Sequence, residues 1–265
     1  MSKGLTKIVG ALCLVALFYG CAKPSKNGLK VVATAVPHAQ ILEFIKPELK
    51  KEEIDLVIIV TDDYNMPNRA LANKEIDANF FQHAPFLDEQ IKEFHYSIES
   101  IAKIELEPMG IYSKKIHALS ELPDKAVIAL PNDPTNEGRA LMLLAKHGVI
   151  QLKNPDKLGS TVLDIQANLK NIQFLEVDAA MLPRSLEDVT VAVINTNYAL
   201  EAGLNPLKDP LVLEDPKNSP YVNILVVREG DENRSDIQAL KKAMTSEKTK
   251  EFILKTYKGA VIPAF

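Results

Sequence analysis

The loop at residues 131–140 holds the side chains best suited to binding an anionic group. It carries two prolines and several residues that favour helix N-caps, and an apolar helix follows it. Thr135 or Asn136 can cap that helix, so free backbone N–H groups and the positive end of the helix dipole would collect there. Arg139 adds a planar guanidinium that can donate two parallel hydrogen bonds. The combination favours a carboxylate or phosphate ligand, although Arg139 could equally be a surface residue on an ordinary capped helix.

Aromatic and polar side chains follow the ends of two earlier predicted strands. Phe81 and His83 stand where one strand meets a helix, and Tyr64 follows the strand before it. Because side chains alternate along a strand, one of Phe80 and Phe81 should face the core and the other should face away from it. His83 can offer a polar edge to a ligand, but a lone histidine more often has a structural role such as satisfying a helix N-terminus.

Two asparagines stand beside later strands. Asn195 follows a run of Val and Ile, and Asn223 lies in another extended run. Their side-chain oxygens can accept hydrogen bonds from an ammonium group. Asparagine is also a common turn former at strand ends, so both interpretations are kept.

The patterns that mark catalytic, metal and nucleotide sites are absent from the sequence. No two histidines lie three or four residues apart, so there is no helical metal pair. The phosphate loop, the Gly-x-Gly-x-x-Gly pattern and the Gly-x-Ser-x-Gly pattern are missing too. We therefore predict no catalytic residue, no metal ligand and no cofactor, and we expect the protein not to be an enzyme.

The N-terminus has the order of a secretory signal. Lys3 and Lys7 precede an apolar run of about a dozen residues, which is too short to span a bilayer, and Gly20 precedes Cys21. We predict that residues 1–20 are a lipoprotein signal peptide and that Cys21 carries the lipid anchor. An ordinary cleaved signal is the alternative. No cysteine follows Cys21, which excludes an intrachain disulfide and a thiolate metal site in the remaining chain.

The bulk of the sequence indicates an α/β protein with two lobes. A chain of 265 residues with a formal net charge of −4 can bury a large core and does not have the charge of a nucleic-acid binder. Predicted strands and helices alternate over residues 29–94 and again over 126–202, which favours parallel sheets covered by helices. The C-terminal stretch 235–257 is predicted to be helical and amphipathic.

Two extended stretches, 98–112 and 221–227, are suited to crossing between the lobes. The predicted division is a tether at 21–28, a first lobe of 29–112 plus 225–265, and a second lobe of 113–224. A cleft between such lobes is a natural ligand site, and helix N-termini facing it suit anionic groups. A single doubly wound domain is the alternative for a chain of this length.

Seven stretches together resemble the methionine-binding lipoproteins of the NlpA type, which supply ABC importers. They include the runs Phe80-Phe81-Gln82-His83 and Asn132-Asp133-Pro134-Thr135-Asn136, and they follow the same order over nearly all of the chain after the signal. The stretches are 63–71, 76–88, 107–115, 127–139, 182–186, 192–198 and 219–223. The resemblance implies the two-lobed periplasmic-binding-protein fold, of a type 2-like form, closing on a free amino acid.

The resemblance also implies a set of site residues, which are Tyr64, Phe81, His83, Glu107, Asn136, Arg139, Asn195 and Asn223. Arg139 would hold the ligand carboxylate, and Asn195 and Asn223 would receive the ammonium. The two aromatic residues and His83 would enclose the side chain, and the remaining two would support the polar end. One departure is that Thr61 and Asp62 stand where the family usually has an aromatic residue and an asparagine, which could alter side-chain preference.

The implied function is capture of methionine outside the cytoplasm by a membrane-anchored lipoprotein. Its partners would be methionine, an ABC permease with its ATPase subunit, and the membrane through the lipid anchor, with no nucleic acid. A zwitterion needs one fixed cation, neutral acceptors and an apolar pocket, and the implied residues supply all three. The alternatives are another small amino acid, a methionine-containing dipeptide, or a surface adhesin or structural lipoprotein with an unused cleft.

Overall fold

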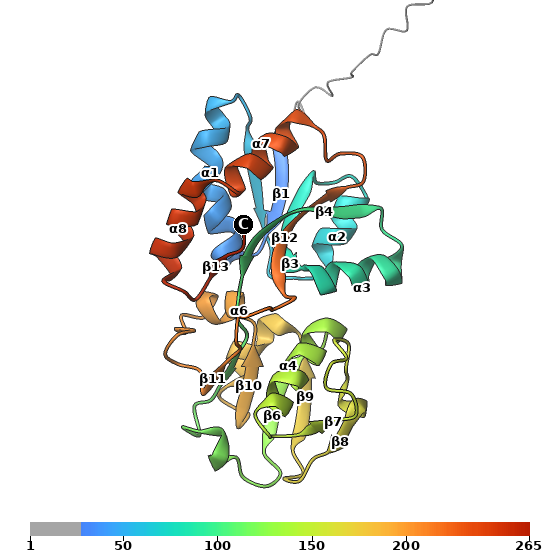
Figure 1. Cartoon of the computed structure of the whole chain (residues 1–265), viewed down its shortest axis with the longest axis vertical. Coiled ribbons are helices and arrows are strands. Elements are labelled where there is room, and N and C mark those ends of the chain that lie inside the picture. The colour runs from blue at the N-terminus through green and yellow to red at the C-terminus, as the bar shows by residue number, and fades with distance from the viewer. Residues whose placement is uncertain (1–27) are drawn as a thin grey trace, which may run out of the picture.

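The computed structural model describes residues 28–265, which form two α/β lobes stacked along the long axis of the molecule (Figure 1). The predicted signal peptide, Cys21 and most of the predicted tether lie outside the described residues. Within residues 28–265, no helix has both the length and the apolar character needed to span a bilayer.

The first lobe is built on a six-stranded sheet with the strand order β13-β4-β12-β3-β1-β2. The strands β1, β2 and β3 are parallel to one another, whereas β12 runs antiparallel to both β3 and β4. The strands are β1 (Leu29–Ala33), β2 (Leu56–Val60), β3 (Ala78–His83), β4 (Ile98–Leu106), β12 (Val222–Arg228) and β13 (Ile262–Pro263). The helices are α1 (Gln40–Lys51), α2 (Met66–Ala72), α3 (Ala84–Phe94), α7 (Ser235–Met244) and α8 (Glu247–Tyr257), and an irregular helical turn, Ala35–Ala39, precedes α1.

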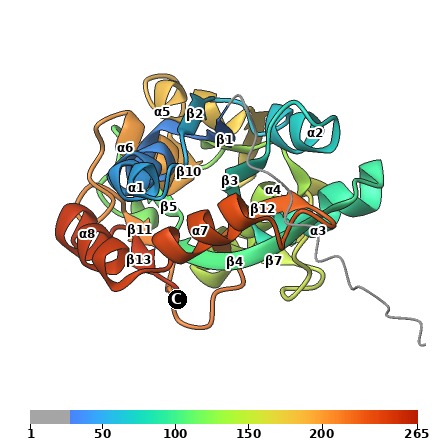
Figure 2. The ribbon, with the colours of Figure 1, turned by 90° about the horizontal axis from the view of Figure 1, so that it is seen from above.

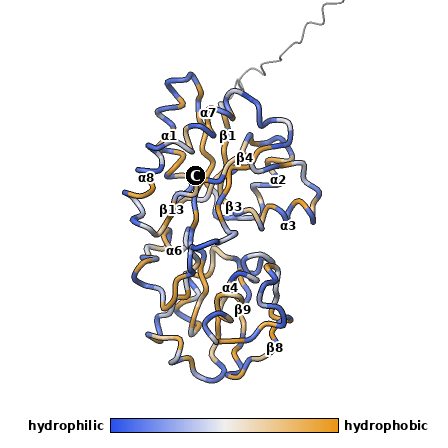
Figure 3. Tube along the Cα trace, viewed as in Figure 1, coloured by the Kyte–Doolittle hydropathy of each residue, from blue (hydrophilic) through white to orange (hydrophobic). Residues whose placement is uncertain are grey.

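Helices cover both faces of this sheet, and strand alternation decides which side chain meets which helices. Val31 packs into the cluster that contains α1, α7 and α8, whereas its neighbour Val32 packs with α2 and α3 on the opposite face. Seen from above, the two groups of helices lie on different sides of the strands (Figure 2). The central strands of both lobes, such as β1, β12 and β10, carry mostly hydrophobic residues, which appear as orange stretches of the trace (Figure 3), as expected for strands buried on two faces.

The second lobe contains a five-stranded sheet with the order β11-β5-β10-β6-β9 and a separate two-stranded β7-β8 ribbon. The helix α4 covers one face of the five-stranded sheet, and α5 and α6 cover the other. The strands are β5 (Gly110–Tyr112), β6 (Val127–Pro131), β7 (Gln151–Leu152), β8 (Ile165–Ala167), β9 (Gln173–Val177), β10 (Val191–Ile194) and β11 (Val212–Leu213). The helices are α4 (Pro134–Lys146), α5 (Leu182–Ser185) and α6 (Thr196–Glu201), and short 3-10 turns occupy Leu119–Glu121, Val162–Asp164 and Ala179–Met181.

Two extended crossings join the lobes, as predicted. One runs from β4 through residues 107–109 into β5, and the other runs from β11 through residues 214–221 into β12. The α/β fold with two lobes is confirmed. Residues 110–112 pair within the second sheet and residues 222–224 within the first, so each of these short stretches lies with the opposite lobe from the one predicted.

The C-terminal stretch 235–257, which was predicted to be helical, forms two helices. The chain breaks at Thr245–Ser246 into α7 and α8, and the Ser246 side chain caps α8 by accepting a hydrogen bond from the Thr249 backbone N–H at 3.2 Å. Serine is among the strongest N-cap residues, because its oxygen satisfies a backbone N–H that has no partner within the helix. The amphipathic pattern continues through the break and therefore concealed it.

Candidate functional site

A cavity between the lobes is lined by all eight residues that the sequence implied. About 360 Å³ of atom-free space, part of which is open to solvent, lies among its lining residues. The implied residues are Tyr64, Phe81, His83, Glu107, Asn136, Arg139, Asn195 and Asn223. Five further residues, which were not predicted from the sequence, complete the lining: His38, Gln82, Phe86, Thr196 and Asn197.

The fold brings these residues together because most of them stand where a strand or a crossing reaches the gap between the lobes. The end of β3 supplies Phe81 and His83, and the first crossing supplies Glu107. From the second lobe, the first turns of α4 supply Asn136 and Arg139. Strand ends of α/β sheets are the usual place for ligand sites, since the polar loops that follow the strands converge there.

The N-terminus of α4 is capped by Asp133, not by Thr135 or Asn136 as the sequence suggested. The Asp133 carboxylate accepts hydrogen bonds from the Asn136 backbone N–H at 2.9 Å and from the Asn136 side-chain amide. Pro134 occupies the first helical position, where its fixed φ suits the helix and its missing N–H costs nothing. The cap therefore lies one residue before the proline.

Arg139 is buried with 4 % exposure and already has an internal carboxylate partner. Its Nε donates to both oxygens of Glu214 at 3.1 and 3.2 Å, and its Nη2 donates to Glu214 and to the Glu107 carbonyl oxygen. The guanidinium carbon also lies 4.3 Å from the centre of the Tyr221 ring. Among residues 28–265, Nη1 makes no hydrogen bond, so this nitrogen is the one available to a ligand carboxylate.

Glu214 ties the guanidinium to both crossings. It lies at the start of the second crossing, and its Oε2 accepts a hydrogen bond from the Met109 backbone N–H in the first crossing at 3.1 Å. Its own N–H donates to the Met109 carbonyl at 2.9 Å. No signal in the sequence points to this residue, because nothing in an irregular acidic stretch marks one glutamate as the partner of an arginine 75 residues away.

A hydrogen-bond network links three of the implied residues across the gap between the lobes. Asn136 Oδ1 accepts from Asn195 Nδ2 at 2.8 Å and faces His83 Nε2 at 3.2 Å. His83 Nδ1 accepts from the Phe86 backbone N–H, which can only donate, so the proton of this imidazole sits on Nε2 and is donated to Asn136. Asn195 Oδ1 is buried and has no protein partner within the described chain, which leaves it free to accept from a ligand.

Aromatic rings form the apolar side of the cavity. The Phe81 ring centre lies 5.9 Å from those of both Tyr64 and Phe86. Phe80 points the other way, into the core of the first lobe, which confirms that one of the two adjacent phenylalanines faces the core and the other faces away. A thioether packs favourably against such ring edges, by about 0.3–1.5 kcal/mol per contact.

Further contacts between the lobes close the site at its rim. The Tyr64 hydroxyl donates to Asn197 Oδ1 at 2.7 Å, and the Tyr198 hydroxyl donates to the Asp62 carbonyl at 2.6 Å. The helix α6 also packs against the turn before α1, and its Leu200 contacts the core of the first lobe. The structure is therefore a closed form in which both lobes contribute to one cavity.

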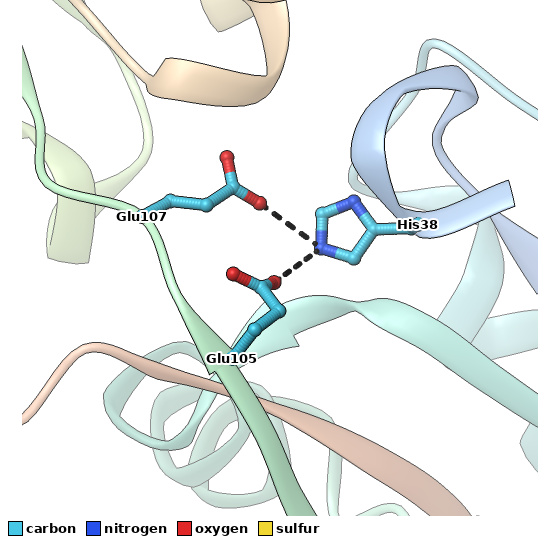
Figure 4. A group of neighbouring side chains, drawn as sticks. All are labelled: His38, Glu105 and Glu107. Atoms are coloured by element: carbon cyan, nitrogen blue, oxygen red, sulfur yellow. Dashed lines mark ion pairs between the residues drawn. The ribbon is translucent and has the colours of Figure 1, made fainter. Parts of the chain in front are cut away.

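A buried cluster of His38, Glu105 and Glu107 lies at the first-lobe side of the cavity (Figure 4). His38 Nε2 is 3.3 Å from an oxygen of each carboxylate, and all three residues are buried. Glu105 and Glu107 are two residues apart on an extended segment, so they share a face. Asn223 lies opposite Glu105 in the sheet and donates to both carboxylates, at 2.8 and 3.0 Å.

The environment of His83 predicts a pH-dependent contribution to stability. Burial, followed by the positive charge of Arg139, lowers the pKa of His83 from 6.5 to about 3. The unfolded chain can take up this proton below pH 6.5 whereas the folded protein cannot, so the free energy of unfolding should fall as the pH drops from 6.5 towards 3. Between about pH 7 and about pH 5 this residue should account for a loss of about 2 kcal/mol.

The variant His83→Gln should lack this contribution. Denaturant unfolding of the wild type and of His83→Gln, at about pH 7 and about pH 5, measures the contribution of His83, because the two proteins share all other titratable groups. Equal pH dependence in the wild type and the variant would show that the imidazole takes up a proton in the folded state.

Comparisons with known proteins agree with this geometry. A family model described as NlpA lipoprotein matches residues 29–265. The chain is 41 % identical to the methionine-binding lipoprotein MetQ of Bacillus subtilis, over 96 % of this chain and 97 % of that protein. It is 40 % identical to the D-methionine-binding lipoprotein MetQ of Escherichia coli, over 96 % and 94 %.

Solved structures give the same result. A nutrient-binding protein from Burkholderia cenocepacia, bound to methionine, is 44 % identical with a TM-score of 0.86, covering 89 % of this chain and 100 % of that one. A periplasmic substrate-binding protein of an ABC transporter from Coxiella burnetii is 46 % identical with a TM-score of 0.84, over 89 % and 100 %. With a matching family model, extensive sequence identity and the same fold, the chain belongs to the NlpA lipoprotein family.

Proposed function

We propose that this protein captures methionine in the cavity between its lobes and delivers it to an ABC importer, without chemistry on the ligand. The observation that carries the proposal is one closed cavity in which a buried arginine, unpartnered amide oxygen and aromatic rings meet. These are the groups that a zwitterion with an apolar side chain requires. The relatives named for methionine binding, and the related structure that contains methionine, support the choice of ligand.

In this proposal, each part of the ligand meets a different wall of the cavity. The carboxylate takes Nη1 of Arg139, whose other nitrogens are held by Glu214 and a backbone carbonyl. The ammonium donates to Asn195 Oδ1, which has no protein partner among the described residues, and to Asn223. The side chain lies against Tyr64, Phe81 and His83, while Asn136 and Glu107 fix the polar end.

The proposed setting is a membrane-anchored protein outside the cytoplasm. The relatives are named lipoproteins, and one structural neighbour is named as a periplasmic substrate-binding protein. The signal-like N-terminus and Cys21 support a lipid anchor, with the rest of the chain on the outer side of the cell membrane. The proposed protein partners are an ABC permease and its ATPase subunit.

Calorimetry and ligand-induced stabilisation test the proposal. At a methionine concentration 100 times its dissociation constant, the free energy of unfolding should rise by about 2.7 kcal/mol, which raises Tm by about 5–10 °C for a chain of this size. Titration with L-methionine, D-methionine, methionine dipeptides and other small amino acids identifies the preferred ligand. Mass spectrometry of material released on denaturation shows what the protein carries from the cell.

Stabilisation by methionine, with weaker effects of the other compounds, is the expected result. A stronger effect of a dipeptide or of another amino acid would change the assigned ligand. If none of these compounds shifts Tm, the cleft is unused and a structural or adhesive role is favoured.

A further inference from the structure

In the cluster of His38, Glu105 and Glu107, more hydrogen-bond acceptors lie together than the donors of the protein can satisfy. A single imidazole N–H can serve only one of two carboxylates, and His38 Nε2 is aligned for a hydrogen bond with neither. Glu105 Oε2 is buried with no partner in residues 28–265. Burying carboxylate charge without compensation costs several kcal/mol, so the cluster needs a further positive charge.

The cluster opens on the cavity beside the acceptors proposed for the ammonium. Glu107, His38 and Asn223 all line the cavity, and so does Asn195 with its free oxygen. A primary ammonium has three N–H donors, and these residues offer it a carboxylate and amide oxygens from both lobes. Arg139 lines the same cavity, so a zwitterion whose carboxylate is held by Arg139 could direct its ammonium towards the cluster.

We propose that the ligand's ammonium enters the cluster of His38, Glu105 and Glu107 in exchange for a proton that the two carboxyl groups hold when the cavity is empty. The exchange is balanced, because one positive charge enters the cluster and one proton leaves to the solvent. The inference rests on the proposed function in taking a zwitterionic amino acid as the ligand. It makes Glu105, which does not line the cavity, a positioning residue that acts through Glu107.

The surroundings of Glu107 favour a shared proton in the empty protein. Burial, then the charge of Glu105 and a hydrogen bond between the two carboxyl groups, raise the pKa of Glu107 well above its usual value, and Arg139 opposes the shift. Several polar groups surround the carboxyl groups of Glu105 and Glu107. From the first lobe they are His38 before α1, Tyr64 and His83 at the rim of the cavity, Asn223 on β12 and Tyr257 on α8. From the second lobe, Arg139 on α4 adds a positive charge. Burial raises the pKa of both tyrosines and lowers that of His83, so all three are neutral at pH 7.

The sign of the pH effect follows from this arrangement. Below the raised pKa of Glu107, the empty protein holds the proton and the complex does not, so binding releases the proton. Affinity should therefore rise with pH across that range and then level off. A cluster that is fully ionised before binding would show neither proton release nor this pH dependence.

Titration calorimetry in two buffers of different ionisation enthalpy measures the proton directly. In phosphate and Bis-Tris at about pH 6.5, we expect the wild type to release up to about one proton per methionine bound. Glu105→Gln removes one of the two acids and keeps the shape, so it should release close to none and show a flatter pH profile of affinity. Glu99→Gln, on the same strand but outside the cluster, is the matched control and should behave as the wild type.

A change in the ligand keeps the test independent of whether Glu105→Gln folds. γ-Methylthiobutyrate has the carbon chain and thioether of methionine but no amino group, so wild-type protein should bind it more weakly and without releasing a proton.

Methionine binding without proton release, or equal release with both ligands, would overturn this inference while leaving methionine binding intact. A stoichiometric transition metal that EDTA removes from the purified protein would also overturn it, by assigning the positive charge to a metal ion. No binding of any amino acid would overturn the proposed function together with this inference.

Discussion

Replacing Arg139 with alanine should weaken methionine binding at least about 100-fold, which corresponds to about 2.7 kcal/mol. Arg139 is the one arginine or lysine that lines the cavity in the described part of the chain. A ligand carboxylate buried there without it would lose its only full opposite charge, and an unpaired buried charge costs several kcal/mol. Titration calorimetry of the purified variant measures the change, and a loss of less than about threefold would contradict the role of Arg139.

The ion pair with Glu214 complicates this experiment and also supplies its control. Removing Arg139 leaves a largely buried carboxylate beside Tyr221 without its partner, which should destabilise the fold by about 1–3 kcal/mol. The double variant Arg139→Ala/Glu214→Gln removes that unpaired charge. It should recover stability, as measured by denaturant unfolding, but it should not recover affinity.

Recovery of affinity in the double variant would give the result a different meaning. It would show that the weak binding of Arg139→Ala came from the unpaired Glu214 carboxylate and from distortion of the two crossings that Glu214 joins. The single variant Glu214→Gln tests the same two explanations by changing the carboxylate partner of the ion pair instead of the arginine. It leaves the guanidinium in place but weakens its support, so its effect on affinity should be smaller than that of Arg139→Ala.

Much of the fold could be predicted because its signals are local. The alternation of strands and helices, and the apolar character of the strands, follow from short stretches of sequence that are buried on both faces. The alternation rule also assigned opposite directions to Phe80 and Phe81 without any knowledge of their partners. The crossings were visible as extended runs, although the sequence alone did not show that 110–112 would pair in the second sheet.

The convergence of the site residues was predicted from the family resemblance, since no local pattern reports which strand ends meet. The residues that were missed have partners far away in the chain. His38 meets Glu105 and Glu107, and Glu214 meets Arg139, only after both lobes have formed. Each looks like an ordinary polar residue in its own segment. Local chemistry was misleading at the α4 cap, where three capping residues compete and the position of Pro134 decides between them.

Replacing Gly138 with alanine should lower both stability and affinity, although helix propensity alone predicts a gain. Gly138 lies inside α4, where alanine is usually better by about 0.5–1 kcal/mol. A Cβ at this position would stand 2.0 Å from the Leu158 carbonyl oxygen and 2.9 Å from the Ser160 backbone nitrogen. Both are backbone atoms, so either α4 or the 157–160 segment must move, and overpacking of this kind costs about 1–3 kcal/mol.

The expected loss of affinity comes from the neighbour of Gly138 in the helix. A shift of α4 moves Arg139 and Asn136, which both line the cavity, so we expect methionine binding to weaken about tenfold. Gly148→Ala is the matched control at the other end of the same helix. Gly148 has a φ of +74°, and a Cβ added to it would meet no atom within 4 Å, so alanine there should cost about 1 kcal/mol of conformational energy and leave affinity unchanged. If Gly138→Ala loses stability but binds methionine as the wild type does, the 157–160 segment has moved instead of the helix, and the position of α4 does not depend on that contact.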